Sequence, residues 1–294
     1  MRKQADFGSP PELLIIDRRK FPDDSKLGTA SPRAFETARA WLRNCRYNHP
    51  CCKRGMDRDP TLPIRVVDVG DSWNQPFLHQ NNGECAPYLA LSYCWGRSGN
   101  FRTTKDSLLD NSREILLETL PTTLRDAIIV TRELGFRCLW IDAIYIVQDD
   151  MEGWNREAAK MQSIYMNAAV TLLALVSDDS RGGLFRSRGS RFVSPVQLSL
   201  HFPPRYRPSR GQKSSELYWF VLPAQAPQAL FKPRPVNFRA WKLQEQHLSQ
   251  QIIHFGSEMM YWECLSSHGS DLDPEGQSCA YGGAGLMTRY NLRC

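Results

Sequence analysis

The chain of 294 residues lacks the sequence features that mark several common protein classes. Its longest uninterrupted apolar run, residues 172–176 with their neighbours, is far too short to cross a bilayer. Arg2 and Lys3 are not followed by an apolar segment before Asp6, so the amino terminus is not a signal peptide. The sequence contains neither a G-x-G-x-x-G fingerprint nor a phosphate-binding G-K-S/T loop. We therefore expect no membrane span, no export signal and neither standard nucleotide-binding loop.

Basic residues exceed acidic ones, giving a net charge of +6, yet they are spread along the chain. The densest groups, at 181–191 and 205–213, lie in sequence rich in glycine, proline and serine, which is typical of loops. A nucleic-acid interface would concentrate basic residues along one helix or groove with interleaved aromatic residues. The composition, 41% hydrophobic and 23% charged, is that of a soluble globular protein, and we do not expect nucleic acid as its partner.

The nine cysteines lack the even spacing of a disulfide framework. Without an export signal, we expect reduced thiols in the cytosol or nucleus, and a cytoplasmic protein. Cys45, His49, Cys51 and Cys52 lie close together, but a structural zinc ion needs four ligands from spaced pairs. Adjacent Cys51 and Cys52 cannot easily both face one ion, and no second Cys/His pair follows at zinc-finger spacing. We predict no metal site and packed thiols, while zinc binding by these four residues stays open as the alternative.

A hydrolase with a serine or cysteine nucleophile would need a histidine base close to its nucleophile. Ser92 and Cys94 are the candidates at the end of a central apolar run. All six histidines lie outside the central apolar runs, and none flanks a nucleophile motif. We therefore do not expect this chemistry.

The pattern of apolar runs predicts an α/β fold with a central, mainly parallel sheet flanked by helices. Three strand-like runs, at 88–95, 137–147 and 170–176, alternate with helical segments. A shorter strand is expected at 63–70 and a helix at 34–43. After residue 177 we expect strands at 193–200 and 217–222, a helix at 238–248, a hairpin of 251–255 with 258–264, and an irregular tail at 266–294.

Two helices between the runs have clear signals. At 121–134, Pro121 precedes the helix, Thr123 and Asp126 have capping-box spacing, and Gly135 is placed as a carboxyl-terminal cap. A second helix begins near residue 152. Its apolar stripe, which we expect to pack on the sheet, consists of Trp154, Ala158, Met161, Ile164 and Tyr165.

Polar and aromatic residues end the first apolar run, where an open α/β sheet usually binds its ligand. Ser92, Tyr93, Trp95 and Gly96 are candidate ligand contacts. Trp95 offers a flat face for a base, and Gly96 would let backbone approach a ligand closely. The alternative is a buried tryptophan packed on a helix, with glycine serving a turn.

Acidic residues lie in and after the second run. Asp142 is expected in mid-strand, where a buried carboxylate needs a partner such as Arg97 or Arg125. Structural anchoring and active-site duty are both open for Asp142. Asp149 and Asp150 fall at the expected strand end and are candidates to meet a ribose hydroxyl or a metal. An ordinary loop and helix start is the favoured interpretation of that pair.

These motifs in this order resemble the heterokaryon incompatibility (HET) domain of filamentous fungi, over roughly residues 40–265. The matching segments are YLALSYCWG (88–96), LPTTLRDAI (120–128), LWID (139–142), QDD (148–150), Trp154, Glu157, 161–165, RAWKLQE (239–245), HFG (254–256) and WEC (262–264). The resemblance divides the chain into an arm (1–39), a HET core (40–190), a mixed α+β continuation (191–265) and the tail (266–294). One departure is Tyr145, where the family usually has cysteine. If that position needs a thiol this copy is impaired, whereas a packing role tolerates tyrosine.

The resemblance implies nonself recognition between fungal cells and programmed cell death after incompatible fusion. The HET domain is also distantly similar to Toll/interleukin-receptor (TIR) domains, which implies a TIR-like, flavodoxin-like sheet and NAD as a possible substrate. Glu157 would then stabilise an oxocarbenium ion at the ribose, with Asp142 in support. The alternative for Glu157 is a first-turn acid favoured by the helix dipole. The alternative function is a non-catalytic adaptor that acts through a protein partner or self-association.

Overall fold

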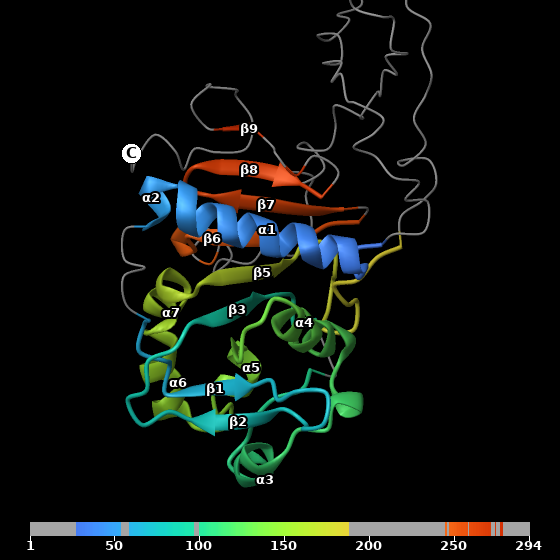
Figure 1. Ribbon diagram of the computed structural model, residues 1–294. Coiled ribbons are helices and arrows are strands. Elements are labelled where there is room, and N and C mark those ends of the chain that lie inside the picture. Colours follow the sequence, from blue (N-terminus) through green and yellow to red (C-terminus); the bar gives the residue numbers. More distant parts are fainter. Residues whose placement is uncertain are drawn as a thin grey trace, which may run out of the picture. The chain divides into compact units, whose positions relative to one another are not determined.

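A mixed sheet of nine strands organises the described part of the chain, in the order β2-β1-β4-β3-β5-β6-β7-β8-β9 (Figure 1). The computed structural model describes residues 28–53, 59–96, 100–187, 245, 247–257, 259–271, 274 and 277–278. All of them belong to the unit of residues 27–187 and 233–294. The strands are β1 Arg65–Asp68, β2 Phe77–Gln80, β3 Tyr88–Ser92, β4 Cys138–Trp140, β5 Val170–Ala174, β6 Gln251–Phe255, β7 Met260–Cys264, β8 Ser267–Ser270 and β9 Gln277–Ser278.

Four neighbouring strands at the centre of the sheet, β4, β3, β5 and β6, pair in parallel. The strands on both sides of them pair antiparallel, β1 and β2 on one side and β7 to β9 on the other. The α/β class and the strands expected near residues 88, 138 and 170 are therefore confirmed, while the sheet as a whole is mixed.

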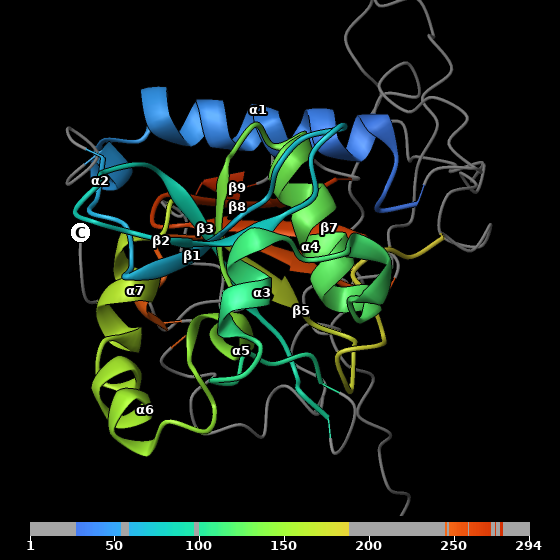
Figure 2. The ribbon, with the colours of Figure 1, turned by 90° about the horizontal axis from the view of Figure 1, so that it is seen from below.

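Helices cover both faces of this sheet. They are α1 Pro32–Asn48, α2 Pro50–Lys53, α3 Leu108–Arg113, the 3-10 helix η2 Leu117–Thr119, α4 Thr122–Glu133, α5 Asp142–Tyr145, α6 Met151–Ala158 and α7 Met161–Asn167. Figure 2 shows α1 on one side of the sheet and α6 and α7 on the other. None of the helices in the described ranges combines the length and apolar character that a bilayer crossing requires.

The two faces of β3 contribute to two separate hydrophobic clusters. Leu89 and Leu91 join the cluster that includes α1 and α4, whereas Tyr88 and Ala90 join the cluster with Trp140 and α7. All five residues of β3 are buried, as expected of a central parallel strand covered on both faces.

The run at 137–147 is not one strand. β4 ends at Trp140, and α5 begins at Asp142, so the expectation that Asp142 lies in mid-strand was wrong. The cause is that α5 is buried throughout, and a short apolar run fits a buried strand and a buried helix equally well. Asp149 and Asp150 consequently precede α6 and do not follow the end of a strand.

Helix α4 has the predicted extent but a different start. No side chain caps its first turn, so the predicted capping box is wrong. The side chains of Thr123 and Asp126 instead accept hydrogen bonds from loop 179–185. Thr123 Oγ1 accepts from Gly183 N at 2.9 Å, and Asp126 Oδ2 accepts from Leu184 N at 2.8 Å. The predicted cap at Gly135 is confirmed: its φ is +81°, and its N–H donates to the Arg132 carbonyl at 2.9 Å.

The second predicted helix is two helices, α6 and α7, which end and begin on either side of Lys160. Ile164 and Tyr165 are buried as expected, but Trp154 is 39% exposed. Glu157, which was not part of the predicted stripe, is buried instead. The helix is interrupted before Met161, and α6 buries Gly153 and Glu157 in place of Trp154.

The predicted hairpin is confirmed as β6 and β7. Part of the tail expected to be irregular forms β8 and β9, which was missed because serine and glycine strands show no hydrophobic alternation. Helix α1 is longer than expected and runs across the predicted boundary at residue 39. The strands expected at 193–200 and 217–222, and most of the helix expected at 238–248, lie outside the described residues.

Candidate functional site

Trp95 and Asp142 meet beyond the carboxyl ends of β3 and β4. The Trp95 indole Nε1 donates to Asp142 Oδ2 at 2.8 Å, and the Ala143 backbone N–H donates to Asp142 Oδ1 at 2.7 Å. Asp142 is 6% exposed and occupies the first position of α5, where backbone N–H groups have no partner within the helix. Its buried carboxylate is therefore held by an indole and a helix start.

Gly96 brings the loop after β3 against the loop after β5. Its φ is +78°, and a Cβ at this position would lie 2.4 Å from Asp179 Cβ. Glycine is required here both for the left-handed backbone and for the close approach. The sequence predicted a close approach to a ligand, and the neighbour in the structure is Asp179.

Ser92 and Tyr93 are almost fully buried and face other protein groups. The Ser92 hydroxyl donates to the Glu245 carboxylate, and the Tyr93 hydroxyl donates to Asn100 Oδ1 at 3.2 Å. Ser249 Oγ donates to the Glu245 carbonyl at 2.6 Å, which extends this network toward β5 and β6. The contact ties β3 to a helical segment more than a hundred residues later in the chain.

Glu157 on α6 is buried and has a partner for each carboxylate oxygen. The Tyr145 hydroxyl donates to Oε2, and Lys160 Nζ lies 3.0 Å from Oε1. Burial raises the pKa of Tyr145, and the hydrogen bond to Glu157 and the charge of Glu157 raise it further. The phenol therefore stays protonated and remains a donor to the carboxylate. Arg65 fixes the other end of Tyr145 by donating from Nε to the Tyr145 carbonyl at 2.7 Å.

Helix α5 connects these two groups, because Asp142 begins it and Tyr145 ends it, one turn apart. We call the set Trp95, Asp142, Tyr145, Glu157 and Lys160 the α5 cluster. Every predicted catalytic residue belongs to it, as does Trp95. The Tyr145 contact was missed, whereas the spacing of Glu157 and Lys160, three residues apart, signals their pairing.

Asp149 and Asp150 do not join the α5 cluster through any contact that the described residues show. Asp149 Oδ1 accepts from the Lys105 N–H at 2.9 Å, and Asp150 precedes the first residue of α6. The Asp150 carboxylate lies over Gly153, where an added Cβ would be 2.1 Å from Oδ2. Both contacts fit the loop and helix-start interpretation of this pair.

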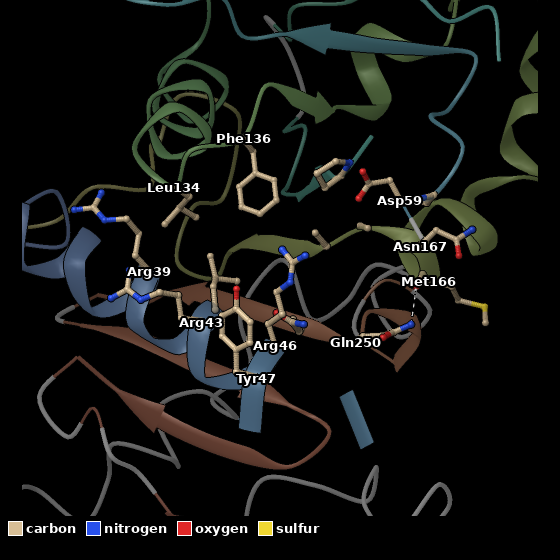
Figure 3. A pocket seen from close by; sticks show the side chains of 16 residues that line it. Arg39, Arg43, Arg46, Tyr47, Asp59, Leu134, Phe136, Met166, Asn167 and Gln250 are labelled. Atoms are coloured by element: carbon tan, nitrogen blue, oxygen red, sulfur yellow. Dashed lines mark hydrogen bonds between the residues drawn. The ribbon is translucent and has the colours of Figure 1, made fainter. Parts of the chain in front are cut away.

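A cavity of about 350 Å³ lies at the opposite, amino edge of the parallel strands (Figure 3). Neither Trp95, Asp142 nor Glu157 lines it. Arginines from α1 lie across it from Leu134 and Phe136, so its chemistry suits an anionic ligand with an apolar part. Its lining consists of Arg39, Leu42, Arg43, Arg46, Tyr47, Asp59, Pro60, Pro87, Leu134, Phe136, Met166, Asn167, Ala168, Ala169, Gln250 and Gln251.

The fold and the α5 cluster together define an α/β protein with a glutamate and an aspartate buried beyond its parallel strands. A family model described as heterokaryon incompatibility protein (HET) matches residues 88–245, more than half of the chain, and the chain belongs to this family. The matched range contains the whole α5 cluster. No curated protein and no solved structure matches the chain.

Proposed function

We propose that this chain acts in nonself recognition between fungal cells and in the programmed cell death that follows incompatible fusion. Membership of the HET family supports this function, because the family model matches every strand and helix around the α5 cluster from β3 to β5. The expected place of action is the cytoplasm, where two fused cells mix their contents. The expected partner is another protein or a second copy of the chain.

We further propose that this copy acts as an adaptor without catalysis, and the state of Glu157 is the observation that carries the proposal. A catalytic glutamate must present its carboxylate to the ribose carbon where positive charge develops. Glu157 is 5% exposed, and both of its oxygens are engaged by Tyr145 and Lys160. To reach a substrate it would have to break both contacts.

The test combines an NAD assay with a toxicity assay on the full-length chain. Purified protein is incubated with NAD over a concentration series, and free nicotinamide is measured. Wild type, Glu157→Gln and Glu152→Gln are also expressed in a filamentous fungus, with cell viability as the readout. Glu152 is exposed on the same helix and serves as the matched control.

The adaptor proposal predicts no nicotinamide at any concentration, larger assemblies as concentration rises, and equal toxicity for all three proteins. Nicotinamide release that Glu157→Gln abolishes and Glu152→Gln retains would overturn it. A monomer at every concentration that is nevertheless toxic would also count against it. Thermal melting of each variant separates a loss of function from a loss of folding.

Glutamate-dependent NAD hydrolysis is the second candidate, and the order of the parallel strands favours it. In chain order these strands are arranged 2-1-3-4, as in flavodoxin-like folds and as expected for a TIR-like sheet. Ligands of such folds bind at the switch point between the first and third of these strands, here β3 and β5. Trp95 and Gly96 follow β3 at that point, which supports a base stacking on the indole in this second candidate.

In this second candidate, Tyr145 controls Glu157. The nicotinamide–ribose bond would break with its electron pair leaving on nicotinamide, and water would add to the ribose carbon that Glu157 stabilises, releasing one proton to solvent. Tyr145→Cys restores the residue usual in the family and Tyr145→Phe keeps the ring, but both remove the hydroxyl bound to Glu157. Nicotinamide release gained by both variants would identify an enzyme restrained by Tyr145. No release from either variant would favour the adaptor.

A further inference from the structure

Four potential metal ligands converge where α1 and α2 meet the end of β7. The ligand atoms of Cys45, His49, Cys52 and Cys264 all lie within 4.8 Å of one another. The three cysteines are buried, and Cys264 Sγ lies 3.4 Å from His49 Nδ1. We call these four residues the sulfur cluster. They lie outside the range that the family model matches.

The fold brings these residues together from two distant parts of the sequence. Cys45 lies in the last turn of α1, and His49 caps that helix by donating its N–H to the Cys45 carbonyl. The chain then turns at His49, and Cys52 N donates to the His49 carbonyl at 3.0 Å.

The fourth ligand, Cys264, ends β7 beneath α1. Trp41 of α1 stacks on Trp262 of β7, with ring centroids 6.0 Å apart and an angle of 20° between the planes. Cys264 follows Trp262 by two residues and so lies on the same face of the strand. Cys45 follows Trp41 by one helical turn. The stacked tryptophans therefore set Cys45 over Cys264.

The donor set and its spacing suit zinc. With Zn–S bonds of about 2.3 Å, a tetrahedral zinc ion holds its sulfur ligands about 3.8 Å apart, so these atoms need only a small contraction. Thiolates with an imidazole favour zinc over magnesium or calcium, which prefer oxygen. Four protein ligands fill a tetrahedral shell and leave no position for substrate, as in structural zinc sites.

Groups around Cys264 also resemble the surroundings of a metal-bound thiolate. The backbone N–H groups of Ser266 and Ser267 point to Cys264 Sγ at 3.4 Å and 3.3 Å. Such outer hydrogen bonds orient metal ligands and spread their negative charge. A disulfide would instead join only two of the three sulfurs and would make no use of the His49 nitrogen.

We propose that Cys45, His49, Cys52 and Cys264 bind one structural zinc ion that fastens α1 and α2 to the end of β7. Binding releases the protons of the three thiols to solvent. The sequence lacked a fourth ligand near Cys45, His49 and Cys52, and β7 supplies it. Cys51, adjacent to Cys52, does not belong to the cluster.

The test measures zinc in the full-length protein, purified under reducing conditions without added metal. Elemental mass spectrometry should find one zinc ion per chain in the wild type and in Cys51→Ser. Cys45→Ser and Cys264→Ser should lose nearly all of it. Cobalt added to metal-free wild type should give the intense visible absorption of a tetrahedral thiolate site, and Cys264→Ser should lack it. Equal zinc contents in Cys51→Ser and Cys264→Ser would overturn the proposal.

A second measurement uses only the wild type and Cys51→Ser, so it does not depend on the folding of the ligand variants. Addition of a zinc chelator should make three further cysteines reactive toward a thiol reagent, beyond those already reactive, and should lower the melting temperature of both proteins. Wild type that carries no zinc, or that has a disulfide between two of these cysteines, would refute the site. A melting temperature indifferent to the chelator would do the same.

Discussion

The α5 cluster and the sulfur cluster differ in how their polar atoms are satisfied. In the α5 cluster, the chain supplies donors for both buried carboxylates: Trp95 and Ala143 for Asp142, Tyr145 and Lys160 for Glu157. In the sulfur cluster, three thiol sulfurs and one imidazole nitrogen lie within 4.8 Å of one another. The chain's own donors thus satisfy the α5 cluster, whereas the proposed zinc ion would join the ligands of the sulfur cluster.

The two clusters also differ in the length of chain that they join. Within the α5 cluster, the contact that spans most sequence joins Trp95 to Asp142, 47 residues apart. In the sulfur cluster, 215 residues separate His49 from Cys264. Closing so long a loop restricts the unfolded chain, so an ion bound there would stabilise the whole fold more than a local contact can.

The largest effect is expected from removing the support of the sulfur cluster. Trp41→Ala should lower the free energy of unfolding by about 3–5 kcal/mol, because it leaves a cavity against Trp262. It should also weaken zinc retention, since Cys45 loses its position over Cys264. Denaturant unfolding followed by circular dichroism provides the measurement. Tyr47→Ala, exposed on the same helix, should stay within about 0.5 kcal/mol of the wild type.

The next largest effect is expected from a substitution in the α5 cluster. Tyr145→Phe removes a donor from the buried Glu157 carboxylate and should cost about 1–3 kcal/mol of unfolding free energy. Its zinc content should equal that of the wild type, because the two clusters share no residue. Tyr47→Phe is the matched control. A simultaneous loss of zinc would mean that the clusters are coupled through the sheet.

Alkaline pH should lower the free energy of unfolding, in part through Tyr145 of the α5 cluster. The folded pKa of Tyr145 is raised, so above about pH 10 the unfolded chain loses this proton first. The free energy of unfolding then falls as pH rises, by up to about 1.4 kcal/mol per pH unit for each such group. Tyr88, whose pKa burial also raises, contributes with the same sign. Denaturant unfolding between pH 9 and 11 should therefore show a shallower decline for Tyr145→Phe; identical slopes would contradict the assignment.

The smallest effect is expected at Lys160. Its side chain is 52% exposed, so its ion pair with Glu157 is screened by water. Lys160→Met should lower the free energy of unfolding by less than about 1 kcal/mol, as measured by denaturant unfolding. Matching losses for Lys160→Met and Tyr145→Phe would show that the two partners hold Glu157 equally.

Local signals in the sequence predicted the elements whose causes are local. The apolar runs near residues 88, 138 and 170 predicted the parallel strands, and Gly135 predicted the end of α4. Trp95 was predicted at the carboxyl end of its strand, where it lies. Asp142 was expected in mid-strand with Arg97 or Arg125 as its partner, whereas it begins α5 and accepts from Trp95.

What the sequence could not predict depends on partners far away in the chain. Thr123 and Asp126 have capping-box spacing, but both side chains accept hydrogen bonds from loop 179–185 instead of capping α4. Strand β8 pairs with β7 without any apolar alternation of its own. Cys264 is far from Cys45 in sequence, and the two residues meet because α1 packs on β7. Tertiary contacts, which leave no periodic trace in a single sequence, decided each of these cases.

The packing of α1 on β7 has a consequence during protein synthesis. Ribosomes make about 5–20 residues per second, so the partner strand emerges roughly 10–40 s after the helix does. Throughout that interval Trp41 lacks its stacking partner Trp262, and this part of α1 is open to chaperones. Helix α1 is thus made long before the strand on which it packs.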